Sequence, residues 1–333
     1  MTGLPATALV LGSNSFSGAS FAAHLLRAGV RVIGASRSPE PREAFLPYRW
    51  GGLGEGFRFV QADLNHDLDA LMDVIAHERP AWVVNFAAQS MVAESWRHPE
   101  HWFRTNVVAT IALHERLRHC DFLERYVHIT TPEVYGSTAG LVDEDAPFNP
   151  STPYAVSRAA ADMSLRTFHT AYGFPVVYTR AANVYGPGQQ LYRLVPRAML
   201  SGRLGRRLPL HGGGWSERSF IHIDDVCEAT LLIARDGRPG QAYHISTERM
   251  VAIRDLVALI ATRMGLAFEQ LAEPVGERLG KDAAYRLDSA KLRDELGWRD
   301  RIGLEQGLDS VLTWVDAHLD ELRTLPLDYV HKA

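Results

Sequence analysis

The chain has 333 residues, and its 35 basic and 39 acidic side chains give a net charge of −4. Hydrophobic residues make up 46% and charged residues 22% of the chain, which is typical of a globular protein and excludes extensive disorder. The mildly acidic balance argues against nucleic acid and anionic membranes as partners, and the two separated cysteines exclude a disulfide framework.

Short apolar runs alternate with longer amphipathic segments in the first half of the chain. The apolar runs predict strands at 8–11, 30–33, 57–60, 82–86 and 126–129. The amphipathic segments predict helices at 16–26, 68–77, 102–120 and 154–172. Continuously apolar strands separated by helices are typical of a parallel sheet covered on both faces. The pattern therefore predicts an α/β protein with a doubly wound parallel sheet of Rossmann type.

The second half of the chain is less regular. It predicts helices at 194–207, 225–234, 253–264 and 291–296, the last ended by Gly297. No linker rich in Pro, Gly and Ser separates the halves, so we expect a smaller α/β domain interleaved with the first. The chain has no stretch of about 18 apolar residues and no signal peptide at its start, which predicts a cytoplasmic protein without a membrane partner.

A glycine-rich turn joins the first strand to the first helix, with Gly12, Ser15 and Gly18 at a Gly-x-x-Ser-x-x-Gly spacing. Such a turn can bind a pyrophosphate through backbone N–H groups and the helix N-terminus, although a turn built only for packing is the alternative. The second strand ends in Ser36 and Arg37, where NAD-preferring folds often have an acidic residue. Because a guanidinium pairs well with phosphate, we expect NADP, with NAD possible; a solvated arginine is the simpler alternative.

Further cofactor residues follow the later strands, where Asp63 is placed to touch adenine and the segment 85–89 would pass beneath the cofactor. The full predicted set of cofactor-binding residues is Gly12, Asn14, Ser15, Phe16, Ser17, Gly18, Ser36, Arg37, Asp63, Leu64, Phe86, Ala87, Ala88, Gln89, Tyr154 and Arg158.

A candidate catalytic group follows the strand at 126–129. Thr131 and Glu133 come at the end of this strand, and Tyr154 and Arg158 are four residues apart on one face of a helix. A free tyrosine has a pKa of about 10 and is a poor base, but a neighbouring cation stabilises its phenolate. A carboxylate such as Glu133 can remove a proton that an adjacent ketone has made acidic. Taken singly, Tyr154 could be a partly buried aromatic and Glu133 a solvated carboxylate.

These motifs resemble those of the extended short-chain dehydrogenase/reductase family, specifically its nucleotide-sugar 4,6-dehydratases, over nearly the whole chain. The resemblance implies that Thr131 polarises the sugar 4-oxygen, that Tyr154 removes the 4-hydroxyl proton and that Glu133 acts at C5 and C6. It implies a lyase that makes an NDP-4-keto-6-deoxyhexose from an NDP-hexose. A 4-epimerase, an NDP-glucuronate decarboxylase and a non-catalytic NADP-binding protein remain alternatives.

The chain departs from the family pattern at three positions of the glycine-rich turn and the catalytic group, and again at Leu279 and Lys281. Ser15 replaces the middle glycine of the turn, and Arg158 replaces the family's lysine. Pro132 stands where dTDP-glucose dehydratases have an aspartate that protonates the leaving hydroxyl. In this respect the chain is more similar to GDP-mannose dehydratases, and Glu133 would then serve as both base and acid.

Other segments resemble the parts of the family that bind the nucleotide sugar, and they imply that Ser90, Asn183, Arg218 and Arg278 contact the substrate. Either arginine alone would more simply form a surface ion pair. The same resemblance divides the chain into two domains. Residues 1–182, with 216–246 returning to them, would bind the dinucleotide, and residues 183–215 and 247–333 would bind the nucleotide sugar.

Two further expectations concern metals and assembly. The 14 histidines show no HxxEH or comparable spacing, so we expect no metal site. Relatives pair the helices that correspond to 102–120 and 154–172 in a dimer interface, which implies a homodimer.

Overall fold

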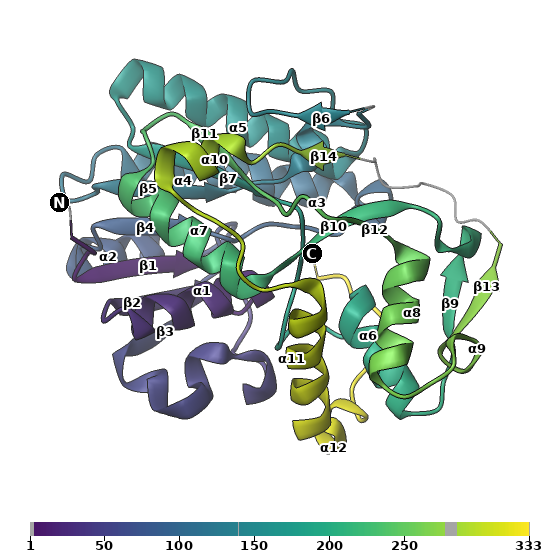
Figure 1. Cartoon of the computed structure of the whole chain (residues 1–333). Coiled ribbons are helices and arrows are strands. Elements are labelled where there is room, and N and C mark those ends of the chain that lie inside the picture. The colour runs from purple at the N-terminus through teal and green to yellow at the C-terminus, as the bar shows by residue number, and fades with distance from the viewer. Residues whose placement is uncertain (1–2, 139, 277–284, 333) are drawn as a thin grey trace.

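A parallel sheet of seven strands forms the centre of the molecule, in the order β11-β7-β5-β4-β1-β2-β3 (Figure 1). The computed structural model describes residues 3–138, 140–276 and 285–332. The predicted doubly wound α/β fold is confirmed. The strands are β1 Thr7–Leu11, β2 Arg31–Ser36, β3 Phe57–Gln61, β4 Trp82–Asn85, β5 Arg125–Ile129, β7 Val176–Ala181 and β11 Ala242–Ile245.

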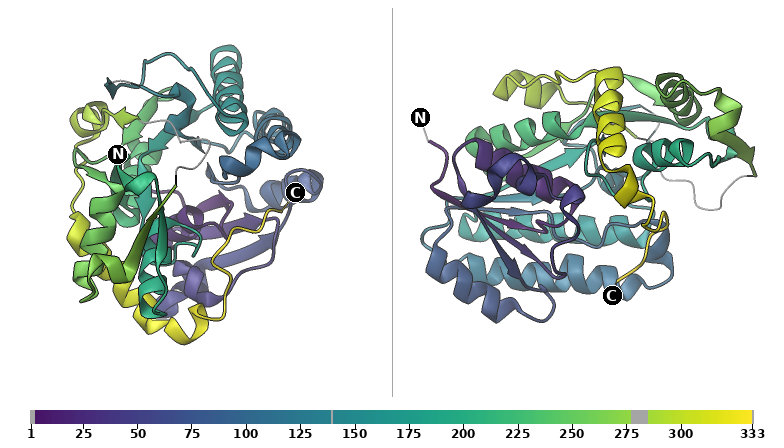
Figure 2. Two further views of the ribbon diagram at one scale, coloured as in Figure 1. Left: turned by 90° about the vertical axis from the view of Figure 1, so that its right-hand side faces the viewer. Right: turned by 90° about the horizontal axis from the view of Figure 1, so that it is seen from below.

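Helices cover both faces of this sheet (Figure 2). Successive strand residues point to opposite faces, so each strand contributes to two hydrophobic cores. Val10, Val84 and Val127 pack in the core that includes α1 (Phe16–Arg27) and α7 (Ile223–Asp236). Leu9, Val83 and Tyr126 pack in the opposite core, which includes α2 (Leu68–Glu78), α4 (Thr110–Leu117) and α5 (Pro153–Tyr172).

The helix predicted at 102–120 is not a uniform α-helix. It begins earlier, as α3 (Pro99–Phe103), passes through the π-helical segment η4 (Arg104–Ala109), and ends in α4. The helix predicted at 194–207 is also shorter than expected. It is α6 (Leu194–Arg203), and Gly205 at φ 64° turns the chain into β9 (Leu208–His211).

A third hydrophobic core lies beside the sheet, where α6, α8 (Ile253–Arg263) and α11 (Leu304–Ala317) pack together. By contrast, Leu292 of α10 (Ala290–Leu296) and Trp298 pack into the core of α1 and α7. No described helix is both long and apolar enough to cross a membrane.

The remaining strands and helices are short. They are η1 Glu43–Phe45, η2 Pro47–Gly56, η3 Ala93–Trp96, η5 Pro132–Tyr135, β6 Leu141–Val142, β8 Asn183–Tyr185, η6 Gly212–Gly214, β10 Glu217–His222, β12 Met250–Ala252, α9 Phe268–Leu271, β13 Ala272–Val275, β14 Arg286–Leu287 and α12 Leu319–Leu322.

Candidate active site

The glycine-rich turn between β1 and α1 brings the backbone unusually close to neighbouring segments. Gly12 has φ 76°, and a Cβ atom there would lie 2.7 Å from the backbone nitrogen of Ala87. A Cβ atom on Gly18 would overlap the carbonyl oxygen of Gly12. The turn therefore requires glycine at both positions and leaves a helix N-terminus open to an anion, which fits a dinucleotide pyrophosphate.

Ser15 occupies the position of the missing middle glycine, and its side chain caps α1. Its Oγ accepts a hydrogen bond from Gly18 N at 3.1 Å and donates one to Gly12 O at 2.7 Å. Serine is a preferred N-cap residue because its oxygen satisfies a free N–H group of the first turn. The departure from the family pattern thus preserves the turn instead of disrupting it.

The loop after β2 is tied to the glycine-rich turn. Asn14 donates its backbone N–H to Ser36 Oγ at 3.0 Å and its side-chain amide to Ser38 O at 2.9 Å. The first carboxylate after β2, that of Glu40, accepts three hydrogen bonds from Arg49, at 3.1, 2.8 and 2.9 Å. Arg37 is half-buried at this edge of the sheet. The end of β2 is therefore hydrogen-bonded directly to the glycine-rich turn.

Asp63 follows β3, but its carboxylate accepts hydrogen bonds from a residue of its own loop. Its Oδ1 accepts hydrogen bonds from the backbone and the side-chain amide of Asn65, at 2.8 and 3.0 Å. The Asn65 amide also reaches Thr105 Oγ1 at 3.2 Å, which joins this loop to the π-helical segment. The Leu64 side chain is buried among the apolar residues that surround α2.

The segment after β4 is held by Asn106, which the sequence analysis did not identify. Its Oδ1 accepts from Gln89 N at 2.8 Å, and its amide donates to Gln89 O at 3.0 Å and Ser157 Oγ at 2.9 Å. The side chain thus links the segment before Ser90 to α5. A polar asparagine inside an otherwise helical stretch is the one signal that could have identified it.

The four candidate catalytic residues meet at the carboxyl end of β5. Thr131 caps η5 by accepting a hydrogen bond from Glu133 N at 3.3 Å, and its side chain also hydrogen-bonds Tyr154. Tyr154 lies in the first turn of α5, and Arg158 lies one turn later, with its guanidinium donating to Ile129 O. Both side chains are buried, whereas Glu133 is partly exposed.

Opposing effects act on the pKa of Tyr154. Burial raises the pKa most strongly, Arg158 lowers it, and Glu133 raises it. The hydrogen bond from Thr131 and the charge of Arg193 lower it further, yet the net pKa stays above its usual value. Arg193 precedes α6, and the sequence analysis did not identify it as a residue near the tyrosine.

Two of the predicted substrate residues lie on neighbouring strands. Asn183 is on β8 and Arg218 is on β10, and these strands pair in parallel with Asn183 opposite Phe220. The Asn183 amide donates to Ser219 O at 3.2 Å. Ser90 is exposed after β4. Arg278, the fourth predicted substrate residue, lies outside the described residues.

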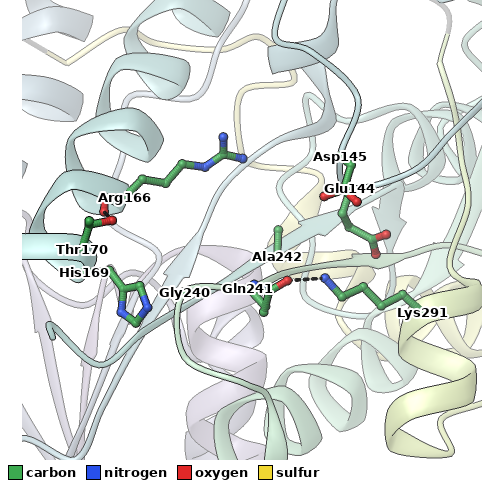
Figure 3. Close-up of a pocket in the computed structure, with 9 residues that line it drawn as sticks. All are labelled: Glu144, Asp145, Arg166, His169, Thr170, Gly240, Gln241, Ala242 and Lys291. Atoms are coloured by element: carbon green, nitrogen blue, oxygen red, sulfur yellow. Dashed lines mark hydrogen bonds between the residues drawn. The ribbon is translucent and has the colours of Figure 1, made fainter.

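A separate polar cavity of 310 Å³ lies at the far end of α5 (Figure 3). Arg166, His169 and Thr170 line it from α5, and Lys291 donates a hydrogen bond to Gln241 at 2.9 Å within it. Thr170 is 16 residues from Tyr154 on the same helix, about 24 Å along its axis. None of the predicted site residues lines this cavity.

The chain matches the family model described as GDP-mannose 4,6 dehydratase over residues 9–311. It is 36% identical to the dTDP-glucose 4,6-dehydratase of Streptomyces antibioticus, over 92% of this chain and 91% of that protein. The solved Streptomyces venezuelae dTDP-glucose 4,6-dehydratase with NAD bound has a TM-score of 0.86 and 31% identity, covering 94% of this chain and 98% of that one. The Thermotoga maritima UDP-glucose 4-epimerase has a TM-score of 0.85 and 25% identity, covering 94% and 99%.

Proposed function

The chain belongs to the GDP-mannose 4,6-dehydratase family, within the extended short-chain dehydrogenases/reductases, and on that premise we propose that it is a nucleotide-sugar 4,6-dehydratase. The observation that carries the proposal is the meeting of Thr131, Glu133, Tyr154 and Arg158 at the end of β5. The reaction converts an NDP-hexose into an NDP-4-keto-6-deoxyhexose and releases one water.

Oxidation at the sugar C4 begins with Tyr154. Its phenolate would take the proton of the 4-hydroxyl while the Thr131 hydroxyl holds the same oxygen, and a carbonyl group would form at C4. When bound, the nicotinamide cofactor supplies reversible hydride acceptance, from C4 at the start and back to C6 at the end. The charge of Arg158 lowers the pKa of Tyr154 and so favours the phenolate, in opposition to burial, which raises that pKa.

Glu133 would catalyse the elimination of water. The C4 carbonyl makes the C5 proton acidic, and the Glu133 carboxylate would remove it. The hydroxyl then leaves C6, takes up a proton and departs as water. Pro132 has no side-chain proton to give, so Glu133 would return to the leaving hydroxyl the proton that it took from C5. C5 would then regain a proton as hydride returns to C6, and this proton balances the one that Tyr154 took from the 4-hydroxyl.

The cofactor is a nicotinamide dinucleotide, for which Gly12, Gly18 and the N-terminus of α1 provide the pyrophosphate site. We propose NADP as its form. Ser36 and Arg37 end β2 without a carboxylate, and the nearby Glu40 carboxylate is occupied by Arg49. Solved relatives are described with NAD, so comparison of the two dinucleotides by calorimetry tests this proposal. Tighter binding of NAD would contradict it.

The substrate, we propose, is held by Ser90, Asn183, Arg218 and Arg278. Asn183 and Arg218 lie on adjacent strands. We propose that residues 183–215 and 247–333 form the nucleotide-sugar-binding part, and the packing of α6, α8 and α11 in the third core supports this division. Arginines suit a diphosphate because the guanidinium can bind its oxygens in pairs. We also propose a homodimer and a cytoplasmic location; the latter is consistent with the free thiols of Cys120 and Cys227.

A mass-spectrometric screen tests the activity. The protein is incubated with NADP or NAD and a panel of GDP-, UDP-, dTDP- and CDP-sugars, including glucuronates. Loss of one water from a single donor is the expected result, and it also identifies the nucleotide. Loss of carbon dioxide would assign a decarboxylase, and an unchanged mass with a shifted retention time would assign an epimerase. Cofactor binding without turnover of any donor would contradict the enzymatic proposal.

A further inference from the structure

The segment after α12 is an extended strap that lies along the protein surface, and we name residues 325–332 the C-terminal strap (Figure 2). Its residues alternate between partly buried and exposed: Leu325, Leu327, Tyr329 and His331 face the protein, and the residues between them face outward. A period of two is the signature of extended backbone with one covered face. The segment is therefore fixed along its length.

The first half of the C-terminal strap is anchored on the third core and α6. Leu325 and Leu327 pack against that core. Arg197 of α6 donates one hydrogen bond to Leu327 O at 3.3 Å and another to Asp328 Oδ1 at 3.1 Å. The Tyr329 ring then meets the Tyr192 ring edge-on, with centroids 5.2 Å apart.

The second half crosses to α3, on the cofactor side of the molecule. The His331 ring stacks on Trp102 with centroids 5.1 Å apart and planes 11° apart. Its Nε2 atom lies 2.9 Å from Nδ1 of His101. The described residues contain no group of three or more His, Cys, Asp or Glu side chains that could hold a metal ion, so this contact is a packing and hydrogen-bonding anchor.

The end of the C-terminal strap reaches two residues predicted for the cofactor site. Lys332 O accepts hydrogen bonds from Gln89 Nε2 at 2.8 Å and from Arg37 Nη2 at 3.1 Å. Lys332 Nζ donates to Ser38 Oγ at 3.2 Å, in the loop that follows β2. The hydrogen bonds from Arg37 and Gln89 to this one carbonyl therefore tie the end of the C-terminal strap to both predicted cofactor residues.

We propose that the C-terminal strap closes the cofactor site, holding Arg37 and Gln89 in position and adding the Lys332 ammonium as a second cation for an anionic group of the dinucleotide. The inference deepens the proposed function and rests on it. A dehydratase returns its cofactor to the starting oxidation state in each turnover, so the cofactor does not need to leave. A segment that spans α6, α3 and the end of β2 is placed to slow its departure.

The test measures dinucleotide release from the full-length protein by stopped-flow fluorescence of NADPH and NADH. The Tyr329→Ala/His331→Ala variant loses the ring contacts with Tyr192 and Trp102 and the hydrogen bond with His101. We expect its dinucleotide release to be about tenfold faster, because each lost contact contributes modestly to holding the C-terminal strap in place. Lys332→Ala removes an exposed ammonium that folding does not need, and we expect several-fold weaker NADPH binding. Val330→Ala is the matched control, because this side chain is 67% exposed on the outward face.

The outcomes separate the two proposals. Unchanged release and affinity in the anchor and lysine variants would overturn the role of the C-terminal strap and leave the proposed function intact. Tighter binding in those variants would also overturn it, because the strap would then compete with the cofactor. If the unaltered protein binds neither dinucleotide, the proposed function itself fails, and the inference fails with it.

Discussion

Glu133 shows at the residue scale what the sequence could and could not predict. Its position two residues after Thr131 was evident from the spacing, and the structure adds the 3.3 Å hydrogen bond from Glu133 N that fixes this short 3₁₀ turn. Arg193 had no such local signal, because its charge reaches Tyr154 only through the packing of α6 beside the sheet. Local motifs can be predicted, but approaches between distant segments depend on tertiary structure.

The Glu133→Gln variant should separate oxidation from elimination. An amide cannot remove the C5 proton, whereas Tyr154, Thr131 and Arg158 remain to oxidise C4. We expect dehydration to fall by about 10²-fold or more, in line with the loss of a general base, and reduced cofactor to accumulate. Absorbance at the reduced-nicotinamide band and mass spectrometry of the sugar measure the two steps. Full dehydration by the variant would refute the assigned role, and Glu94→Gln provides a carboxylate control outside the proposed catalytic group.

His244 should make stability depend on pH. Burial and the nearby Arg180 charge lower its pKa to about 3, and its ring contacts the Tyr135 hydroxyl at 2.8 Å. Between pH about 6.5 and 3 the unfolded chain binds a proton at this position that the folded chain does not, so stability is full above this window and falls as pH drops through it.

Urea denaturation at pH 7.5 and 5.5 measures this loss. We expect the free energy of unfolding to fall by about 1 kcal/mol for this histidine over that interval. His244→Gln should show a smaller fall between the two pH values than the unaltered protein, whatever its absolute stability. His119→Gln changes an exposed histidine, so its free energy of unfolding should fall between the two pH values as much as that of the unaltered protein. Equal falls in all three proteins would show that His244 does not contribute.

At the element scale, the most reliable predictions concerned strands buried on both faces. Val83 and Val84 face opposite cores, so β4 is apolar on both faces up to its last residue, Asn85, and stands out in the sequence. The π-helical segment could not be predicted in this way. Asn106, in the middle of this segment, hydrogen-bonds Gln89 and Ser157, which are 17 and 51 residues distant in the chain, and such contacts leave no local pattern in the sequence. The C-terminal strap was missed because its alternation is short and because an apolar residue, Val330, lies on its outward face.

Gly18→Ala should impair the glycine-rich turn. The added methyl group would overlap Gly12 O and crowd Ser15 Oγ, so the chain between them must move and the pyrophosphate site must change. We expect dinucleotide affinity to fall at least about tenfold. The melting temperature should fall only slightly. Gly303→Ala is the control, because that glycine has φ −62° and no atom within 4 Å of the added carbon. Calorimetric titration with the dinucleotide compares the two variants with the unaltered protein. Equal affinities of Gly18→Ala and Gly303→Ala would contradict the proposed site.

At the scale of the whole molecule, apolar side chains remain exposed on the paired helices of one face. They include Phe103, Val108, Met163 and Tyr172, with 37, 65, 58 and 58% of their surface exposed. The first two lie in α3 and η4 and the others in α5, and these helices pack against one another. Exposed apolar patches of this kind are typical of interaction sites. The location is consistent with the proposed homodimer.

Analytical ultracentrifugation tests this assembly. We expect a dimer for the unaltered protein and a monomer for Met163→Glu, because a buried, unpaired carboxylate in the interface costs several kcal/mol. Leu141→Glu is the matched control: this side chain is 59% exposed and belongs to β6, not to α3, η4 or α5. A monomeric unaltered protein, or a Met163→Glu variant that stays dimeric, would exclude this interface.

The packing of Trp298 against the sheet has a consequence for synthesis of the chain on the ribosome. Its indole N–H donates to Asp225 O at 3.2 Å, and the Asp225 carboxylate accepts from the backbone N–H groups of Arg301 and Ile302, both at 3.0 Å. The first 181 residues provide six of the seven sheet strands, but this core stays incomplete until residue 302 has left the exit tunnel. The nascent chain therefore exposes apolar surface for most of its translation. Chaperones that recognise such surface would bind the chain before its folding is complete.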